Sequence, residues 1–586
     1  MIRLAWLSLW MPLVLAAQAP SFDQRVRSVV ETYAHPTGNG ALGYANIAAK
    51  LWLHDDAALC SRRLEELLTA PSGDMFWMYP VTAIAYLDQG QLSTSARKTL
   101  RDSFRTYMPY RGDTENHWVM YYTSLYLMAQ LWPGQDGDQW YTGKSSLENM
   151  QEAAGWLESW VRLTTRRGQG EYDSPNYMGM YLLSMSYLAA WARDPAMKQR
   201  AAMMLEYLIA DYAAEQIDGV YVGAHSRVYD REVLEKWNVG ASDFGWILFG
   251  LGHALPPPSN QALFYVLASA YQPPEILRLI ASDRSQPYTE YERKRTRNRW
   301  RFFDELHGPV YKTTYVRREY AVSSDQGGTL QPIQEHSWDI TWSVPDPRGI
   351  QNTLFTLNPY SSLKELETYF TFPADIGISG VVSSKKSYDS PDKFVGGSPY
   401  EKILQDQDTI IVLYDIEAGA RFPHVNGFFS KDLAELSEDP TGWIFARGGD
   451  ALIACRPLQP YVWKPIDGGG RRLFSPYLKN GMVLQVAAVS EFAGMAEFRR
   501  AILALPLEFS LDPKPSVRFR SLRGRNLEFM YGETPRVDGV ALEYSRWPLF
   551  GGPFLEAPVD SETLILKYGS LRRTLDFRTL SVSDSH

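Results

Sequence analysis

The sequence predicts an α+β multidomain protein, in which an (α/α) toroid of helical hairpins precedes antiparallel β-sandwich domains. Apolar residues recur at the three- and four-residue spacing of helices from about residue 24 to residue 283. After Pro309 the pattern changes to the alternation that is typical of strands. A length of 586 residues also exceeds what one hydrophobic core usually supports, so two or three domains are expected.

Residues 1–19 have the character of a secretory signal peptide. Arg3 precedes an apolar stretch from Leu4 to Ala17, and small residues follow it. The stretch is too short to count as a spanning helix. A secreted or periplasmic protein without membrane insertion is therefore expected.

The composition, with 45% hydrophobic and 22% charged residues, is that of a soluble globular protein. The formal net charge of -8 argues against nucleic acid as a partner. An acidic polysaccharide stays open, because basic residues cluster from Arg293 to Arg299, although such a run is more often a solvated surface. Cys60 and Cys455 fall in different predicted domains, so buried unpaired thiols are expected.

About a dozen helices, or six hairpins, are predicted for a toroid over residues 20–290. Antiparallel helices in sequence either stack as an open solenoid or close into a toroid. Aromatic residues on the inner faces of these helices, which include Tyr121, are expected mostly to pack in the hydrophobic core. The predicted helices are 25–33, 41–53, 59–68, 77–87, 96–108, 117–132, 147–163, 177–191, 201–212, 244–251, 262–268 and 274–280.

The β region is divided into a linker over residues 291–309, a sandwich over residues 310–510 and a small C-terminal module over residues 511–586. Residues 442–454 predict a hairpin, with Gly448-Gly449 in a turn that needs positive φ. The other clear alternating segments are 310–316, 338–342, 409–414 and 564–568.

Polar residues recur about once per helix pair, at Asn116, Asn176 and His225. Thr114 or Asp113 can cap the helix that begins near Asn116, and Ser174-Pro175 has the pattern of a cap followed by the first helical residue. Such groups are usually simple caps, but their repetition predicts that they collect at one end of the toroid, at a groove for a long substrate. The positive helix ends there favour a bound anion.

An extended segment is predicted over residues 221–231, and its plain interpretation is a polar edge strand. The residues expected on one side of it are His225, Arg227, Tyr229 and Arg231. His225 and Tyr229 would stand about 13 Å apart, too far to serve the same carbon atom. The proton partner of Tyr229 is therefore expected to be His117, from another helix.

Asparagine, histidine, arginine and tyrosine together suit β-elimination at a uronic acid. The C5 proton becomes acidic only after the neighbouring carboxylate is neutralised, which Asn116 with Arg227 or His117 could do. A base must then remove that proton, and an acid must protonate the leaving oxygen at C4. Holding a tyrosine as phenolate at pH 7 would cost roughly 4 kcal/mol, which a neighbouring Arg227 could offset.

These motifs resemble those of the alginate, chondroitin and heparinase-like polysaccharide lyases, which combine a helical toroid with an antiparallel β-sandwich. The resemblance rests on Asn116-His117, residues 171–177, the Arg227–Tyr229 pair and residues 442–450. It implies that Asn116 neutralises the carboxylate, with His117 as base or orienting group. It also implies Arg227 as charge partner and Tyr229 as acid, or as acid and base. For the histidine that the resemblance implies from the sandwich, His336 and His424 are the candidates, and His225 is a further catalytic candidate.

The predicted function is therefore that of a secreted lyase acting on a uronic-acid-containing polysaccharide. No cofactor is expected, and an assisting divalent cation is left open. Two alternatives remain, a glycoside hydrolase that uses paired carboxylates from Glu115, Glu171 and Asp173, and a non-catalytic glycan-binding protein. The lyase is preferred because a hydrolase gives no reason for the Asn-His and Arg-Tyr pairs. The expected substrate-binding residues are Glu115, Glu171, Asn176, Tyr177, Tyr121, Arg231 and His336.

Overall fold

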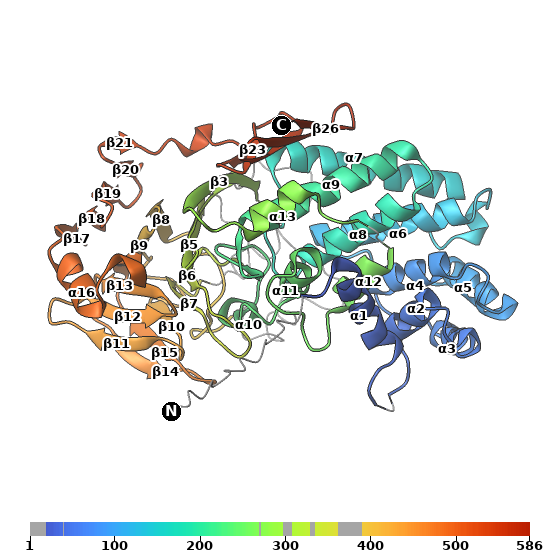
Figure 1. Cartoon of the computed structure of the whole chain (residues 1–586), viewed down its shortest axis with the longest axis horizontal. Helices are drawn as coiled ribbons and strands as arrows, with labels where there is room; N and C mark the ends of the chain where they lie inside the picture. Colours follow the sequence, from blue (N-terminus) through green and yellow to red (C-terminus); the bar gives the residue numbers. More distant parts are fainter. Residues whose placement is uncertain are drawn as a thin grey trace, which may run out of the picture.

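The computed structural model describes residues 19–38, 40–268, 271–296, 308–327, 334–360 and 389–585, so nearly all of the predicted signal peptide lies outside it. Helices fill the N-terminal half and antiparallel strands most of the remainder, which confirms the predicted fold class (Figure 1). In this part of the chain, no helix combines the length and the apolar character needed to cross a bilayer. Cys60 and Cys455 are buried free thiols, as predicted.

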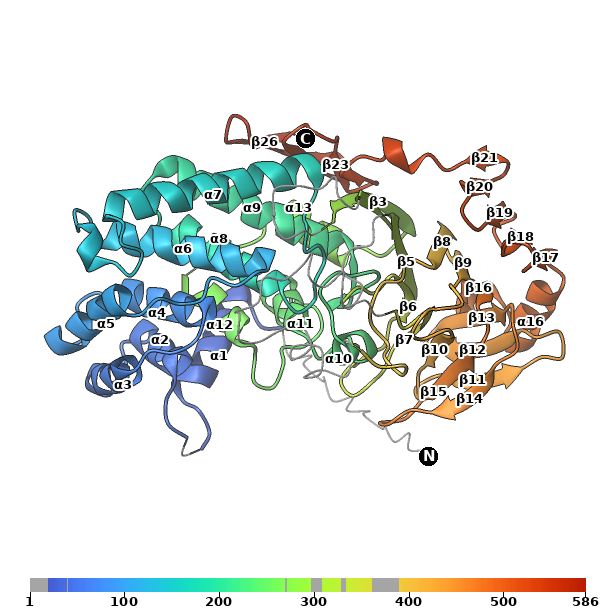
Figure 2. The same cartoon turned by 180° about the vertical axis from the view of Figure 1, so that it is seen from behind.

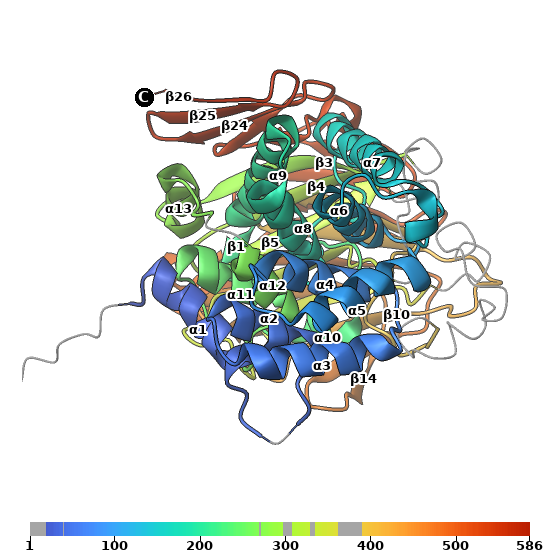
Figure 3. The same cartoon turned by 90° about the vertical axis from the view of Figure 1, so that its right-hand side faces the viewer.

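Helices of the N-terminal region close into a ring. They are α1 (Phe22–Ala34), α2 (Tyr44–Trp52), α3 (Ala57–Thr69), α4 (Met75–Leu87), α5 (Thr94–Thr106), α6 (Glu115–Leu131), α7 (Ser146–Arg167), α8 (Met178–Trp191), α9 (Pro195–Ala214), α10 (Asp230–Leu234), α11 (Gly240–Phe244), α12 (Asn260–Ala268) and α13 (Glu275–Ser282). Helices α2, α4, α6, α8 and α12 contact one another in this order, and α12 packs back against α2 (Figure 3). The toroid is thus closed.

The inner helices are apolar on nearly every face. Helices α4, α6 and α8 bury most of their residues, whereas α1, α3 and α5 keep an exposed polar side. Each of α4, α6 and α8 follows an outer helix, so the three run in the same direction. Their N-terminal ends therefore lie at one end of the toroid, where Phe76 of α4 meets His117 of α6 with ring centroids 5.5 Å apart.

The strands form sheets that are antiparallel throughout. They are β1 (Gln216–Ile217), β2 (Val220–Tyr221), β3 (Tyr288–Arg295), β4 (Pro309–Val316), β5 (Tyr320–Gly327), β6 (Trp338–Trp342), β7 (Thr353–Leu357), β8 (Glu401–Asp406), β9 (Thr409–Asp415), β10 (Val425–Phe429), β11 (Ala434–Glu438), β12 (Ile444–Gly448), β13 (Ala451–Pro457), β14 (Val462–Pro465), β15 (Arg471–Ser475), β16 (Lys479–Ala488), β17 (Leu507–Ser510), β18 (Ser516–Arg520), β19 (Asn526–Met530), β20 (Arg536–Val537), β21 (Val540–Ala541), β22 (Phe550–Gly551), β23 (Leu555–Ala557), β24 (Thr563–Tyr568), β25 (Leu571–Asp576) and β26 (Ser581–Ser585). The largest sheet has 13 strands in the order β14-β15-β10-β7-β6-β5-β4-β3-β22-β23-β24-β25-β26. A six-stranded sheet, β11-β12-β13-β16-β9-β8, packs on it, and their facing side chains, such as Trp338 and Val412, share one core.

The segment expected to be a linker begins with β3, which pairs with β4 along its whole length. The basic run here is not simply a solvated surface, because Lys294 and Arg295 are buried. The predicted hairpin at residues 442–454 is confirmed as β12 and β13, with Gly449 at φ +55° in the turn.

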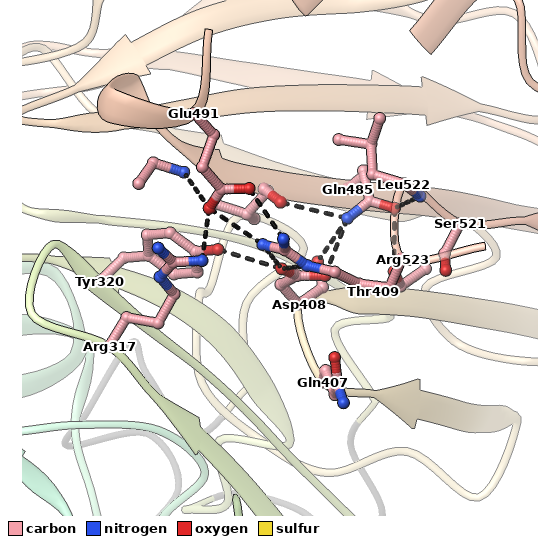
Figure 4. Close-up of polar contacts among 12 residues, drawn as sticks. Arg317, Tyr320, Gln407, Asp408, Thr409, Gln485, Glu491, Ser521, Leu522 and Arg523 are labelled. Carbon is pink, nitrogen blue, oxygen red and sulfur yellow. Dashed lines mark hydrogen bonds and ion pairs between the residues drawn. The ribbon is translucent and has the colours of Figure 1, made fainter. Parts of the chain in front are cut away.

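The C-terminal region divides into two parts. Strands β17–β21 form a five-stranded sheet, whereas β22–β26 continue the large sheet from β3 and lie against α9 and α13 (Figure 2). A partly buried charge cluster joins the five-stranded sheet to the sandwich (Figure 4). There, Arg523 donates to Asp408, 2.6 Å away, and to Glu491, 2.8 Å away. The turn between β18 and β19 is thereby fastened to two other sheets, because Tyr320 of β5 also donates to Asp408. Helix α16 (Met495–Leu503) follows β16.

Candidate functional site

Asn116 lies at the start of α6, which is capped by the hydroxyl of Thr114, one of the two predicted caps. Its side chain is completely buried. The Asn116 amide nitrogen donates to Thr114 Oγ1 at 2.9 Å and to Glu171 Oε2 at 2.6 Å, and the backbone N–H of Asn116 donates to the same Glu171 oxygen at 3.1 Å. Both amide hydrogens are therefore used inside the protein, which holds this side chain in one orientation.

Glu171 is the centre to which several site residues connect. Its Oε2 atom also accepts from the Tyr181 hydroxyl at 2.9 Å, and its Oε1 atom lies 3.4 Å from Nε of Arg227. The backbone N–H of Glu171 donates to Glu115, which forms an ion pair with Arg295 at 2.7 Å. Both carboxylates are buried. Their contacts hold the chain in place around Asn116, although the sequence predicts that they bind substrate.

Arg227 has a left-handed backbone, with φ +57°. The predicted extended segment is therefore interrupted here, and α10 begins soon after it at Asp230. Simple strand alternation does not decide which side chains share a side. Arg227 instead donates to Gln334 and places its guanidinium 4.6 Å from the centre of the Tyr177 ring.

Tyr177 and Tyr229 form a hydroxyl pair, with their oxygen atoms 3.1 Å apart. Both residues are partly exposed. Tyr177 is positioned by a turn in which its N–H donates to Ser174 Oγ at 3.1 Å, and α8 begins at the next residue, Met178. Burial raises the pKa of the Tyr177 phenol, while the positive charge of Arg227 lowers it. Arg227 is thus the neighbour that favours the phenolate.

His225 and His336 pair through their backbones, and the N–H of each donates to the carbonyl of the other at 2.9 Å. The His225 Nδ1 atom lies 2.7 Å from the carbonyl oxygen of Asp173, and His336 Nε2 lies 2.8 Å from Asp339. Lys236 also contacts Asp339, at 2.6 Å. Burial lowers the pKa of both histidines, which favours their neutral forms. The backbone pairing of these two histidines joins the toroid to the sandwich.

The remaining predicted residues differ in exposure. His117 is partly exposed and packs edge-on against Phe76. Asn176 is also partly exposed, whereas Tyr121 is buried in the core of the toroid. Arg231 is exposed and its guanidinium lies 3.9 Å from Glu232. The structure thus connects Asn116, Glu171, Arg227, Tyr177 and Tyr229 in one chain of contacts.

Sequence reasoning missed two parts of the site. Gln334, the acceptor for Arg227, belongs to no motif and comes from the sandwich. The grouping of Asp173 with three other buried carboxylates was also missed, and oxygen atoms of the four lie within 4.8 Å of one another. Its members are Asp173, Asp211, Glu215 and Glu292. These are the described residues that could hold a metal ion, but Lys294 and Lys312 place ammonium groups among them.

No family model and no curated protein matches this chain. Among solved structures, it is similar to the heparan sulfate lyase HepC from Pedobacter heparinus, with 9% identity, coverage of 87% of this chain and 89% of that chain, and a TM-score of 0.39. The chondroitin AC lyase of Streptomyces coelicolor A3, solved with chondroitin sulphate, has 12% identity, coverage of 97% and 90%, and a TM-score of 0.44. A heparinase III has 11% identity, coverage of 89% and 77%, and a TM-score of 0.35. The likeness lies in the layout, helices followed by antiparallel sheets.

Proposed function

We propose that this protein is a polysaccharide lyase that cleaves a uronic-acid-containing polymer by β-elimination. The main support is the chain of contacts that leads from Asn116 through Glu171 and Arg227 to the tyrosine pair. Three segments that are far apart in sequence contribute to it. A cation beside a phenol favours the phenolate, and a phenolate can take and return the proton that elimination moves.

In this proposal Tyr229 removes the C5 proton of the uronate. The electron pair of the C5–H bond then forms the C4–C5 double bond, the C4–O4 bond breaks, and O4 takes a proton from the tyrosine pair. Tyr177, whose hydroxyl contacts that of Tyr229, binds the substrate and orients the base. The buried Asn116 amide acts through Glu171, whose carboxylate lies beside Arg227. We assign the contact with the substrate carboxylate to His117, which is partly exposed at the positive end of α6.

The contacts give less support to a glycoside hydrolase. Its paired carboxylates would be Glu115, Glu171 and Asp173, and these are 2%, 0% and 4% exposed. Each already contacts a buried arginine or lysine of the chain. A carboxylate in that state has little access to a glycosidic oxygen or to an attacking water, both of which a hydrolase requires.

We also propose that the protein is exported. The support for this is the resemblance of residues 1–19 to a secretory signal peptide.

The test is a screen of uronate polymers, including alginate, glucuronan and glycosaminoglycans, with ultraviolet absorbance as the readout. Elimination leaves an unsaturated uronate that absorbs, so absorbance should rise with wild-type protein and not with Tyr229→Phe. New reducing ends without absorbance would indicate hydrolysis, and a bound but intact polymer would indicate a binding protein. Parallel assays with a chelator and with added divalent ions decide whether an ion assists.

A further inference from the structure

A buried charged cluster lies below residues 171–177, the segment that carries Glu171 and Tyr177. Its side chains come from that segment, from the end of α9 and from strands β3 and β4. Its members are Asp173, Asp211, Glu215, Glu292, Lys294 and Lys312, all between 0% and 4% exposed. Buried ions are costly unless they are paired, so a cluster of this size calls for an explanation.

Asp173 is held on both of its carboxylate oxygens. Lys294 on β3 lies 3.1 Å from Oδ1, and Lys312 on β4 lies 2.7 Å from Oδ2. The other carboxylates complete the surroundings of the two ammonium groups, because Lys294 also contacts Asp211 and Glu292, and Lys312 contacts Glu215. The two strands are directly paired, so the lysines form one rigid receptor for Asp173.

The carboxyl groups of the cluster differ in the direction in which their pKa values are shifted. Burial raises the pKa of Asp173, but the two lysines more than offset this and leave it below its usual value. Burial raises the pKa of Asp211 to about 7, and that of Glu292 is raised well above its usual value. Asp173 is therefore the carboxylate whose negative charge the lysines stabilise most.

The backbone at Asp173 also needs support. Its φ of +50° is in the left-handed region, which residues other than glycine, asparagine and aspartate rarely adopt. Its carbonyl oxygen contacts His225, while the neighbouring Tyr172 hydroxyl donates to Asp325 at 2.6 Å and Ser174 Oγ donates to the Arg227 carbonyl at 2.9 Å. The turn at residues 172–174 is thus hydrogen-bonded both to β5 and to the segment that carries Tyr229.

We propose that Asp173, Lys294 and Lys312 are positioning residues, through which the β-sheet sets the location of Glu171 and Tyr177 in the toroid. They touch neither substrate nor reacting atoms. The kinetic part of this inference rests on the proposed lyase function, and the structural part does not. A cluster that only stabilises the fold would have no selective effect on the site.

The test compares Asp173→Asn with a matched control. Asparagine keeps the size of the side chain and tolerates the left-handed backbone, so the substitution mainly removes the charge. Lys312→Met instead removes the ammonium group that contacts Asp173 Oδ2. The control is Arg523→Met, which breaks a partly buried ion pair at the distant junction of Figure 4. Melting temperatures and circular dichroism establish that each variant is folded.

We expect Asp173→Asn and Lys312→Met to lower kcat by about 10- to 100-fold, the range for residues that orient a site through others, with little change in KM. Arg523→Met should lower the melting temperature and leave kcat near the wild-type value. Wild-type kcat in folded Asp173→Asn, or an equal loss of kcat in Arg523→Met, would overturn the kinetic part.

Amide hydrogen exchange provides a readout that does not depend on activity. Asp173→Asn should accelerate exchange in residues 171–177 and 225–229 by about tenfold or more, while Arg523→Met should do so near Asp408 and Glu491 instead. If the wild-type protein cuts no uronate polymer, the proposed function fails and the exchange pattern alone decides the inference. Unchanged exchange in residues 171–177 would then overturn it.

Discussion

At the scale of single residues, Arg227 favours ionisation of Tyr177, because its charge partly offsets the rise that burial causes in the pKa of this phenol. Burial raises the pKa of Tyr177 above its usual value, and the charge of Arg227 limits this rise, so Arg227→Ala should raise that pKa further. If the phenolate is needed, the rising limb of kcat/KM against pH should move to higher pH in the variant. Because the change also leaves Glu171 without this neighbour, thermal stability should fall as well. Lower stability with an unmoved pH profile would mean that the arginine is purely structural.

The two tyrosines should differ in importance. Tyr229→Phe keeps the ring and deletes the hydroxyl proposed to take the C5 proton, so nearly all elimination activity should be lost while the fold is kept. Tyr177→Phe removes a hydroxyl that contacts Tyr229, so substrate binding should weaken and turnover should fall by no more than about tenfold, the value of one hydrogen bond. Steady-state kinetics of both variants check this order. Equal losses, or the reverse order, would contradict the assigned roles.

The residues that sequence could predict here are those with a local signal. Asn116 at a helix start and the Arg227–Tyr229 pair are visible as motifs, and the structure joins them through Glu171. The contact between the two tyrosine hydroxyls and the role of Gln334 depend on segments far apart in sequence. Spacing along the chain carries no information about such contacts.

At the scale of elements, the turn before α6 sets the position of His117. Gly112 has φ +77°, and a Cβ atom there would collide with the His117 ring. Gly112→Ala should therefore move this ring and lower both stability and turnover. Gly134 provides a control, because its φ is +72° but a Cβ atom at this position would have open space around it. Gly134→Ala should cost only the backbone strain, about 1–2 kcal/mol in denaturant unfolding, and leave turnover unchanged. Equal effects of the two substitutions would show that the His117 contact is unimportant.

Helical hairpins are predictable from sequence because their apolar period is local. The predicted helix at residues 117–132 corresponds to α6, Glu115–Leu131, and its cap is Thr114. Strand β3 is hidden from sequence reasoning, since Lys294 and Arg295 look like surface charges until their partners in α9, α6 and residues 171–177 are known. The prediction for residues 221–231 is wrong in part because a left-handed Arg227 ends the alternation.

At the scale of the whole molecule, buried acids make stability depend on pH. Burial raises the pKa of Glu401 on β8 to about 7, above the value of about 4.3 expected in the unfolded chain. The folded protein therefore binds a proton between about pH 4 and pH 7 that the unfolded chain has released, so this residue's contribution to stability falls as pH rises, by about 4 kcal/mol in all. Glu401→Gln should gain stability relative to wild type over that range in urea unfolding. Parallel stability curves for the two proteins would contradict this.

The closed toroid and the sandwich meet at the proposed site, so its chemistry depends on both. Asn116, Tyr177 and Tyr229 come from the helical half, and Gln334 and the lysines below Asp173 come from the sheets. Neither half alone contains the complete set of contacts.

The most direct test of the central claim is cleavage of a uronate polymer in water enriched in heavy oxygen, followed by mass spectrometry of the products. Elimination adds no water across the broken bond, whereas hydrolysis adds one water for each bond cut. We expect products that carry an unsaturated uronate and no heavy oxygen from the solvent. One heavy oxygen per cleaved bond, in saturated products, would contradict the lyase assignment.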